Sequence, residues 1–318
     1  MRKLLSLILL ALKCYFYDAK NFIFHSMILD YKKTQQRFLG KITLHAHVVE
    51  KGLTMPNMKP NFGKDNLFLL IDLCIEYFNS NYDINHDLYI SAVSVIFEYK
   101  NTHNDLGIEL DVDTMNNIKK LYKIYPFIQH SSQPTITKEE FFAQSKSNFF
   151  DFAHSRHSVR CFEGDVNMDK LKLAIELAQT APSACNRQPS RVHVVSKGKL
   201  FDEILNIQQG NRGFGFLANK LLVVSVDISS YCIMRERMGM FVDGGIYIMN
   251  LLYSLHYYNI AACTLNWFSE PEMDKKIKSL LKIEDEQVIA ILAIGDLPNE
   301  FKYAKSVRID ISKVLTVH

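Results

Sequence analysis

The stretch Ser155-Arg156-His157-Ser158-Val159-Arg160-Cys161-Phe162 is the most informative part of the chain. It follows a segment with helical spacing and is expected to run extended, so that residues two apart point to the same side. Arg156, Ser158 and Arg160 then share one side, and Val159 faces the other. Two guanidinium groups and a hydroxyl on one side match the oxygens of a phosphate. The pattern predicts a phosphate site, with a solvated basic strand edge as the alternative.

A second stretch, residues 180–190, reads Thr-Ala-Pro-Ser-Ala-Cys-Asn-Arg-Gln-Pro-Ser. It joins a predicted helix to a predicted strand. The side chain of Asn186 carries one acceptor and a pair of donors, which suits the edge of a heterocycle such as a pyrimidine ring. Pro182 and Pro189 would hold this amide in place before a ligand binds. A rigid, turn-rich loop without a ligand is the alternative interpretation.

Helix and strand patterns alternate from about residue 151 onward, which predicts a layered domain of helices and sheet. Helices are expected at residues 169–179, 199–207, 241–258 and 270–281. Strands are expected at residues 191–195, 221–226, 260–265 and 287–294, with a further extended piece in residues 303–316.

The first part of the chain has only helical patterns. Apolar residues recur at helical spacing in residues 66–78, 88–99 and 115–128. Thr137-Lys138-Glu139-Glu140 is a capping box, which predicts a helix from there to about residue 153. We therefore expect a helical N-terminal extension over residues 1–150 and a second domain over residues 151–318.

Together, the two stretches resemble the FMN-dependent nitroreductase family, in the order Arg-His-Ser-Val-Arg-x-Phe and then Ala-Pro-Ser-x-x-Asn-x-Gln-Pro. Residues 243–252 and 261–267 are similar to the family's long central helix and the strand after it, and residues 294–296 and 305–308 to its C-terminal segment. The resemblance covers about residues 150–312 and implies an α+β fold, a sandwich of sheet and helices. Residues 47–53 are similar to an extension in members associated with polysaccharide biosynthesis. Ser190 and Arg191 depart from the family, which commonly has an aromatic residue there.

The resemblance implies a set of cofactor-binding residues. Around the FMN phosphate they are Arg156, His157, Ser158 and Arg160, joined by Lys305 and Arg308. Asn186 would bond the pyrimidine edge, while Pro182, Ser183 and Gln188 would shape the pocket. Leu265, Asn266 and Trp267 would lie near the isoalloxazine, with a backbone amide aimed at N5. Family members are homodimers with two flavins at the interface, so part of each site would come from the partner.

Composition narrows the range of functions. The chain has 318 residues, 48% of them hydrophobic, and a formal net charge of +3. This is a globular composition without the one-signed charge of a nucleic-acid binder. The six cysteines are scattered with no zinc-ligand spacing, which favours free thiols in a reducing cytoplasm and no metal site.

The N-terminus combines a basic start with an apolar run over residues 4–12. Lys13 ends the run and no small-residue cleavage site follows, so a secretory signal is not indicated. We expect an apolar helix docked on the protein. The alternative is weak contact of residues 1–20 with a membrane surface, since Arg2, Lys3, Lys13 and Lys20 would meet anionic lipid.

Four further features of the sequence have a functional and a structural interpretation. His47 and Glu50 lie one helical turn apart, where a structural hydrogen bond is favoured over metal ligation. Arg187 is a candidate cation beside the flavin ring. Residues 210–215 follow no strand, so they do not form a dinucleotide fingerprint, and a mobile loop over the flavin is the better hypothesis. Residues 234–240 are rich in methionine, which favours packing at a dimer interface.

These patterns predict a cytoplasmic FMN oxidoreductase that passes hydride from NADH or NADPH to an unidentified small organic acceptor. That acceptor would be a nitro or quinone compound or a glycan-pathway intermediate. Two alternatives stay open. One is a related flavin enzyme that performs dehydrogenation or flavin fragmentation, and the other is a non-catalytic scaffold in surface polysaccharide biosynthesis. No protein nucleophile or general base is required, because the flavin itself accepts and donates the hydride.

Overall fold

The β-branched runs of the second half of the chain form one antiparallel sheet. Its strands are β2 (Ser190–Ser196), β3 (Lys220–Asp227), β4 (Ala261–Leu265) and β5 (Glu286–Gly295). The order across the sheet is β2-β3-β5-β4, so β3 and β5 are the inner strands. Both are buried along nearly their whole length, which explains their almost continuous apolar sequences.

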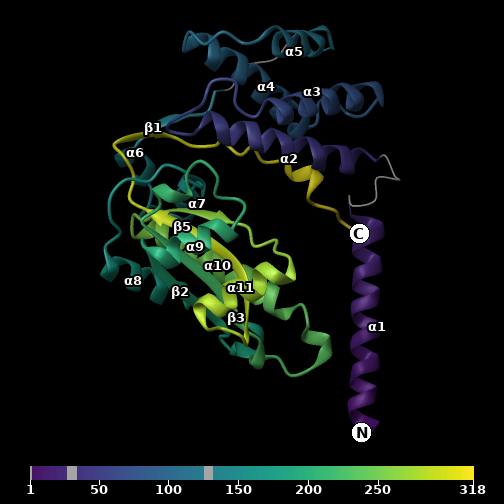
Figure 1. The fold of residues 1–318 in the computed structure, drawn as a ribbon, viewed down its shortest axis with the longest axis vertical. Coiled ribbons are helices and arrows are strands. Elements are labelled where there is room, and N and C mark those ends of the chain that lie inside the picture. The colour runs from purple at the N-terminus through teal and green to yellow at the C-terminus, as the bar shows by residue number, and fades with distance from the viewer. Residues whose placement is uncertain (1, 27–33, 125–131) are drawn as a thin grey trace. The chain divides into compact units, whose positions relative to one another are not determined.

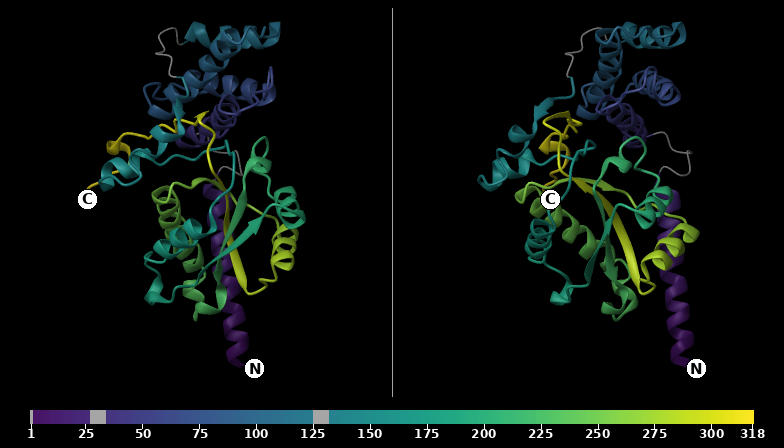
Figure 2. Two further views of the ribbon diagram at one scale, coloured as in Figure 1. Left: turned by 90° about the vertical axis from the view of Figure 1, so that its left-hand side faces the viewer. Right: turned by 60° about the vertical axis from the view of Figure 1, so that its left-hand side comes forward.

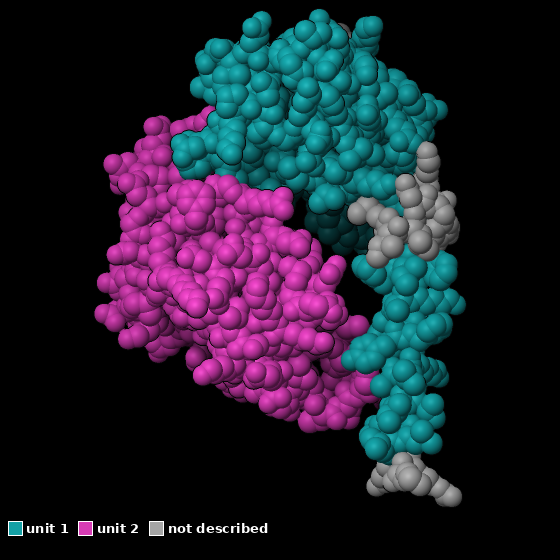
Figure 3. All heavy atoms as spheres, viewed as in Figure 1, with its two compact units in different colours: residues 1–133, 305–318 teal, residues 134–304 magenta. Residues whose placement is uncertain are grey.

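The structure is a computed structural model that describes residues 2–26, 34–124 and 132–318 (Figure 1). The chain divides into two units, which are coloured separately in Figure 3. One, here called the helical unit, consists of residues 1–133 and 305–318. The other, here called the sheet unit, consists of residues 134–304.

Helices cover both faces of the sheet (Figure 2). On one face α8 (Met168–Ala178) packs against α10 (Gly239–Tyr257), and on the other α9 (Lys199–Ile207) packs with α11 (Pro271–Leu281). The core between the sheet and the first helix pair includes Leu171, Leu222, Val224, Leu251, Leu255, Leu292 and Ile294. The helices and strands predicted for residues 169–294 are confirmed, with bounds that differ by a residue or two.

The central helix α10 approaches the sheet closely at Gly244. A Cβ atom there would lie 2.6 Å from Cγ1 of Ile289 on β5 and 3.1 Å from Cγ2 of Val226 on β3. At the next residue, Gly245, a Cβ would meet nothing within 4 Å. Residue 244 must therefore be glycine for α10 to pack this close to the sheet.

The helix predicted from residue 137 to about residue 153 is wrong in its length. The capping box is present, because Thr137 and Glu140 each accept from the other's backbone amide. However, α6 (Lys138–Phe142) ends after five residues and α7 (Phe149–Ser155) begins separately. Asn148 caps α7 by accepting from the amide of Asp151 at 3.2 Å, and this local hydrogen bond starts a new helix.

A small two-stranded sheet joins distant parts of the sheet unit. β1 (Thr135–Thr137) pairs antiparallel with β6 (Glu300–Lys302). The extended piece expected at residues 303–316 is not regular strand. β6 ends before it, and residues Ile311–Lys313 form a single 3₁₀ turn.

The helical unit confirms the predicted helical N-terminal region. Among the described residues five helices precede β1: α1 (Arg2–His25), α2 (Gln35–Leu53), α3 (Lys64–Asn79), α4 (Asp87–Asp105) and α5 (Val112–Ile124). Residues 125–128 of the helix predicted at 115–128 lie outside the described residues. Helix α2 packs on α3 and α4 through a core that contains stacked rings of Tyr77 and Tyr89, with centroids 4.7 Å apart.

Helix α1 does not match the expectation of a docked helix. Most of its described side chains are exposed, including Leu4 at 63% and Phe16 at 72%. Within the described part of the chain, no helix combines the length and the apolar character needed to span a bilayer.

Candidate functional site

Residues 156–163 run along the outer edge of β4. The amide of Val159 donates to the carbonyl of Ala262 at 3.1 Å, and the amide of Glu163 donates to the carbonyl of Asp296 at 3.0 Å. The ring of Phe162 lies against Gly295 at the end of β5, where a Cβ would be only 2.7 Å from Cδ1 of the ring. These contacts fix the segment that carries the arginines of the first motif.

The side chains of this segment differ in burial. Val159 is fully buried, and Arg160 is 8% exposed with its guanidinium carbon 6.0 Å from the centroid of the Phe214 ring. Arg156 and Ser158 are partly exposed. The ring of His157 lies beside that of Tyr303, with centroids 4.3 Å apart. Val159 thus faces the interior as predicted, while Arg160 is more enclosed than a residue on a solvated edge.

His256, which the sequence reading missed, lies where this segment begins. Its Nε2 is hydrogen-bonded to Oγ of Ser155 at 2.8 Å, and the rings of Phe141, Phe142 and Phe152 surround it. Burial, helped by the positive charges of Arg156 and His157, lowers the pKa of His256 to about 4. The sequence feature that could have indicated His256 is a single histidine in the last turn of an apolar helix.

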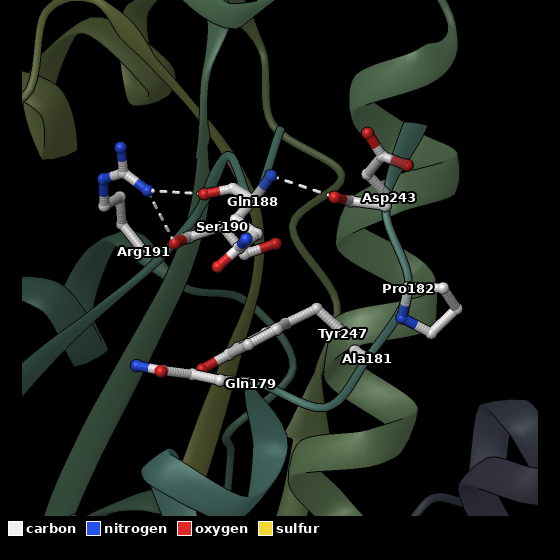
Figure 4. A pocket seen from close by; sticks show the side chains of 9 residues that line it. Gln179, Ala181, Pro182, Gln188, Ser190, Arg191, Asp243 and Tyr247 are labelled. Carbon is white, nitrogen blue, oxygen red and sulfur yellow. Dashed lines mark hydrogen bonds between the residues drawn. The ribbon is translucent and has the colours of Figure 1, made fainter. Parts of the chain in front are cut away.

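The second motif borders a cavity of ≈ 240 Å³ (Figure 4). Three residues predicted for the pocket, Pro182, Ser183 and Gln188, line it. The remaining lining residues come from the end of α8, the start of β2 and the first half of α10: Gln179, Ala181, Ser190, Arg191, Asp243 and Tyr247. Asn186 is not part of the lining, but its Oδ1 accepts from Nε2 of Gln188 at 3.2 Å.

The loop at this cavity is strained and held by side chains. Cys185, Asn186 and Gln188 have φ values of 53°, 53° and 51°, a left-handed conformation that costs non-glycine residues energy. Ser183 accepts from the amide of Gln188 at 2.9 Å. Asp243 on α10 accepts from the amide of Ala184 at 3.0 Å. Backbone strain of this kind is concentrated at functional sites.

Asp243 connects the loop to a second segment, and the sequence reading missed this role. Its Oδ2 accepts from the hydroxyl of Tyr231 at 2.7 Å, and its side chain is buried. Burial and the bond to Asp243 raise the pKa of Tyr231. The sequence feature that could have indicated this role is a single acidic residue, Asp243, in an otherwise apolar helix.

Arg187, predicted from sequence as a candidate cation beside a flavin ring, forms an ion pair with Glu236. Its guanidinium donates to Glu236 at 2.7 and 3.2 Å and to the carbonyls of Ser230 and Ala184 at 2.9 and 3.1 Å. This pairing holds the pKa of Glu236 at about 2. Because so many of its donors are used, Arg187 acts as a clamp between the loop and residues 230–236.

Leu265, Asn266 and Trp267 follow one another at the end of β4. Leu265 is buried and paired with Ile291, while Asn266 and Trp267 line a separate cavity of ≈ 180 Å³. Nε2 of Gln208 donates to the carbonyl of Asn266 at 2.8 Å, and Nε1 of Trp267 donates to Asp274 at 3.2 Å.

The glycine-containing segment at residues 210–215 is tied to the end of α9. The amide of Gly210 donates to Oε1 of Gln208 at 2.7 Å, and the side chain of Asn211 donates to the carbonyl of Leu205 at 2.8 Å. The segment therefore contains a hydrogen-bonded turn, and its predicted position over a flavin stays a prediction.

Lys305 and Arg308 belong to the helical unit, whereas the other predicted site residues belong to the sheet unit. The amide of Lys305 donates to the side chain of Gln133 at 2.7 Å, and Arg308 lines a cavity with His47 and Glu50. The predicted hydrogen bond between His47 and Glu50 is confirmed at 2.9 Å. In the part of the chain that the structure describes, no group of three or more His, Cys, Asp or Glu is placed to hold a metal ion.

The two motifs lie at opposite edges of the four-stranded sheet. The first motif runs beside β4 and the second leads into β2, which are the two outer strands. Along α10, the loop is bonded to Asp243 and the first motif begins at His256. These two residues are separated by about 20 Å along a helix axis. One chain therefore does not bring both motifs around a single point.

A family model matches the part of the chain that carries both motifs. The family model described as "Nitroreductase family" matches residues 153–212, which contain both motifs. Solved structures similar to this chain include a nitroreductase family protein from Streptococcus pneumoniae, at 19% identity, covering 54% of this chain and 100% of that one with a TM-score of 0.48. Another, from Clostridium difficile, has 20% identity and covers 53% and 97%, with a TM-score of 0.45. A third, from Desulfovibrio desulfuricans, is a complex with FMN at 19% identity, covering 54% and 98%, with a TM-score of 0.46. No curated protein matches the chain.

Proposed function

We propose that the protein is an FMN-dependent oxidoreductase that transfers hydride from NADH or NADPH to a small organic acceptor. One observation carries the proposal. The family match over residues 153–212 contains both the arginine motif and the strained loop at the 240 Å³ cavity. FMN, when bound, supplies the hydride and electron chemistry, and the protein supplies binding and orientation.

The donors of the first motif fit a phosphate. Arg156 and Arg160 provide forked N–H donors and Ser158 adds a hydroxyl, on a segment whose backbone is hydrogen-bonded to Ala262 of β4 and to Asp296. The burial of Arg160 would strengthen its interaction with an anion, because water screens less in an enclosed site. In this proposal Lys305 and Arg308 join the phosphate group, and His157 supports the segment through its contact with Tyr303.

The amides of the second motif fit the edge of a flavin ring. Asn186 and Gln188 offer donors and acceptors next to a cavity whose walls include Pro182 and Ser183. Their conformation is fixed before binding by Ser183 and Asp243, which lowers the entropy cost of holding a ligand. In this proposal Leu265, Asn266 and Trp267 lie against the ring from another side.

The separation of the motifs supports a homodimer with the flavin at the interface. Because the motifs are about 20 Å apart along α10, the loop of one copy would complete the phosphate site of the other. The exposed apolar residues Met238, Phe241, Val242 and Ile246, near the start of α10, would be covered in this dimer. We propose a nitro or quinone compound, or an intermediate of glycan biosynthesis, as the acceptor.

The test begins with the purified chain. It should be yellow, with flavin absorbance near ~450 nm, and NADH or NADPH should bleach it without oxygen. Arg156→Ala with Arg160→Ala should weaken FMN binding by at least roughly tenfold, since each charged hydrogen bond contributes about 1.5–3 kcal/mol. Lys172→Ala, which removes an exposed cation from α8, is the control and should bind FMN normally.

The outcomes separate the alternatives. A yellow protein that neither NADH nor NADPH reduces would favour flavin chemistry with another donor. A colourless protein that does not bind added FMN would favour a non-catalytic scaffold and would end the proposal. A panel of quinones, nitroaromatics and nucleotide-sugar intermediates would then identify the acceptor class.

A further inference from the structure

Helix α1 (Arg2–His25) exposes large apolar side chains along most of its length. Leu5, Leu12 and Phe22 are 58%, 62% and 63% exposed, and Phe16 is exposed further. Contiguous apolar surface of this kind usually marks a site of interaction with a protein or a membrane. The question is therefore which surface this helix fits.

Most of the apolar residues of α1 lie on one side, although Leu7, Leu10, Tyr17 and Phe24 lie outside it. With 100° between successive residues, an arc of roughly 160° contains only Leu, Ile, Ala, Tyr and Phe. We call this arc the apolar face of α1; its members are Leu4, Leu5, Ile8, Leu9, Ala11, Leu12, Tyr15, Phe16, Ala19, Phe22 and Ile23. It is wider than the stripe that a surface helix normally turns toward a protein core.

The side of α1 next to the apolar face carries positive charge. Ser6, Lys13 and Lys20 are spaced seven residues apart and so form one line along the helix, beside one edge of the apolar face. Both lysines are exposed, and Asp18 is the one acidic residue in the sequence of α1. A surface that accepts this helix must be apolar beneath and anionic around it.

We propose that α1 binds in the plane of an anionic phospholipid surface, with its apolar face among the acyl chains and Lys13 and Lys20 at the headgroups. Helices with Leu and Phe on one face and Lys on the other are typical of this interfacial position. Lys13 lies at the middle of the helix, where a spanning orientation would place a charge at the centre of the bilayer, at high cost. This inference does not depend on the proposed oxidoreductase function.

The aromatic residues favour a lipid surface over a second copy of the chain. Tyr15, Phe16, Tyr17, Phe22 and Phe24 gather in the second half of α1 and are all exposed. Tyrosine side chains with an apolar ring and a polar tip suit the boundary between headgroups and acyl chains. A dimer contact through the apolar face would leave Tyr17 and Phe24, on the lysine-bearing side, in water, whereas a lipid interface accommodates aromatic rings beside lysines.

The experiment measures flotation of the full chain with vesicles of phosphatidylcholine alone and with one quarter phosphatidylglycerol. The chain should bind the anionic vesicles more tightly than the neutral ones, and added salt should weaken binding to the anionic vesicles. Ile8→Glu with Leu12→Glu should reduce binding about tenfold or more. The control, Leu44→Glu with Leu106→Glu, changes leucines that are 59% and 60% exposed outside α1, and it should bind like the unchanged chain.

The lysines provide an independent test. Lys13→Gln with Lys20→Gln should weaken binding to anionic vesicles about 25-fold, since each basic residue near such a surface contributes a factor of roughly five. Binding to neutral vesicles should not change. The proposal is overturned if the chain does not float with anionic vesicles, or if Ile8→Glu with Leu12→Glu binds them normally. A dimer in ultracentrifugation that this pair of substitutions dissociates, without any vesicle binding, would instead identify a second copy as the partner.

Discussion

The imidazole of His256 and the hydroxyl of Ser155 are hydrogen-bonded, with 2.8 Å between Nε2 and Oγ. Ser155 is the last residue of α7 and His256 lies in the last turn of α10. The bond therefore connects the central helix to the residue directly before Arg156. It makes the position of the arginine motif depend on a buried, neutral histidine.

The first prediction concerns pH. His256 has a pKa of about 4 in the folded chain and an ordinary pKa near 6.5 when unfolded. The unfolded chain thus binds the extra proton more readily, so the contribution of His256 to stability is complete above pH 6.5 and decreases as the pH falls toward 4. The decrease should reach about 3 kcal/mol. Urea unfolding at pH 7 and pH 4.5 measures it.

His256→Gln isolates this contribution, because glutamine keeps polar atoms near Ser155 but does not titrate. The variant should lose less stability than the unchanged chain over the same pH interval, although it is less stable at pH 7. Equal pH dependence in both proteins would show that His256 is not the group responsible.

The second prediction uses two adjacent glycines in α10. Gly244→Ala should destabilise the fold by about 1–3 kcal/mol, because the new Cβ overlaps Ile289 and forces the helix away from the sheet. Gly245→Ala should stabilise by up to about 1 kcal/mol, because a Cβ there meets nothing and alanine favours a helix. Thermal unfolding of the two variants gives opposite signs if the packing is as described.

The third prediction concerns the clamp formed by Arg187 and Glu236. Arg187→Met should speed amide hydrogen exchange in residues 183–190 and 231–236, because it removes the hydrogen bonds that join these segments. Lys199→Met is the control, since Lys199 forms only a long pair with Glu203 at 3.9 Å on an exposed surface. Exchange rates that rise equally in both variants would contradict the clamp.

The fourth prediction concerns Asp243. Asp243→Asn leaves one oxygen for two donors, the amide of Ala184 and the hydroxyl of Tyr231, and should cost about 1–3 kcal/mol. Tyr231→Phe removes only one of these bonds and should cost less. Denaturant unfolding compares the two variants. If Tyr231→Phe is as damaging as Asp243→Asn, the bond to Ala184 contributes little.

Much of the fold follows from local pattern. The central strands are long apolar runs and α10 is a long apolar helix, so their positions could be predicted from residue spacing alone. The strand Thr135–Thr137 could not, because its pairing partner lies at Glu300–Lys302. The break between α6 and α7 was missed because the cap supplied by Asn148 competes with continuation of a weakly amphipathic segment.

The candidate site was only partly accessible from sequence. Residue types pointed to the arginine motif and the amide loop, and Pro182, Ser183 and Gln188, predicted to shape a pocket, line the cavity, whereas Asn186 does not. The pairing of Arg187 with Glu236 could not be predicted, because Glu236 lies far along the chain and nothing local indicates the pair. The placement of the two motifs at opposite edges depends on strand order, which local spacing does not encode.

Gly244 does not line the cavity at the amide loop, yet its neighbour Asp243 and the residue one turn later, Tyr247, both border it. The depth at which α10 sits on the sheet therefore sets how far these two side chains reach into that space. Substitutions on the hidden side of the helix, at Ile289 or Val226, offer a way to widen or narrow the cavity while leaving every atom of its lining chemically unchanged.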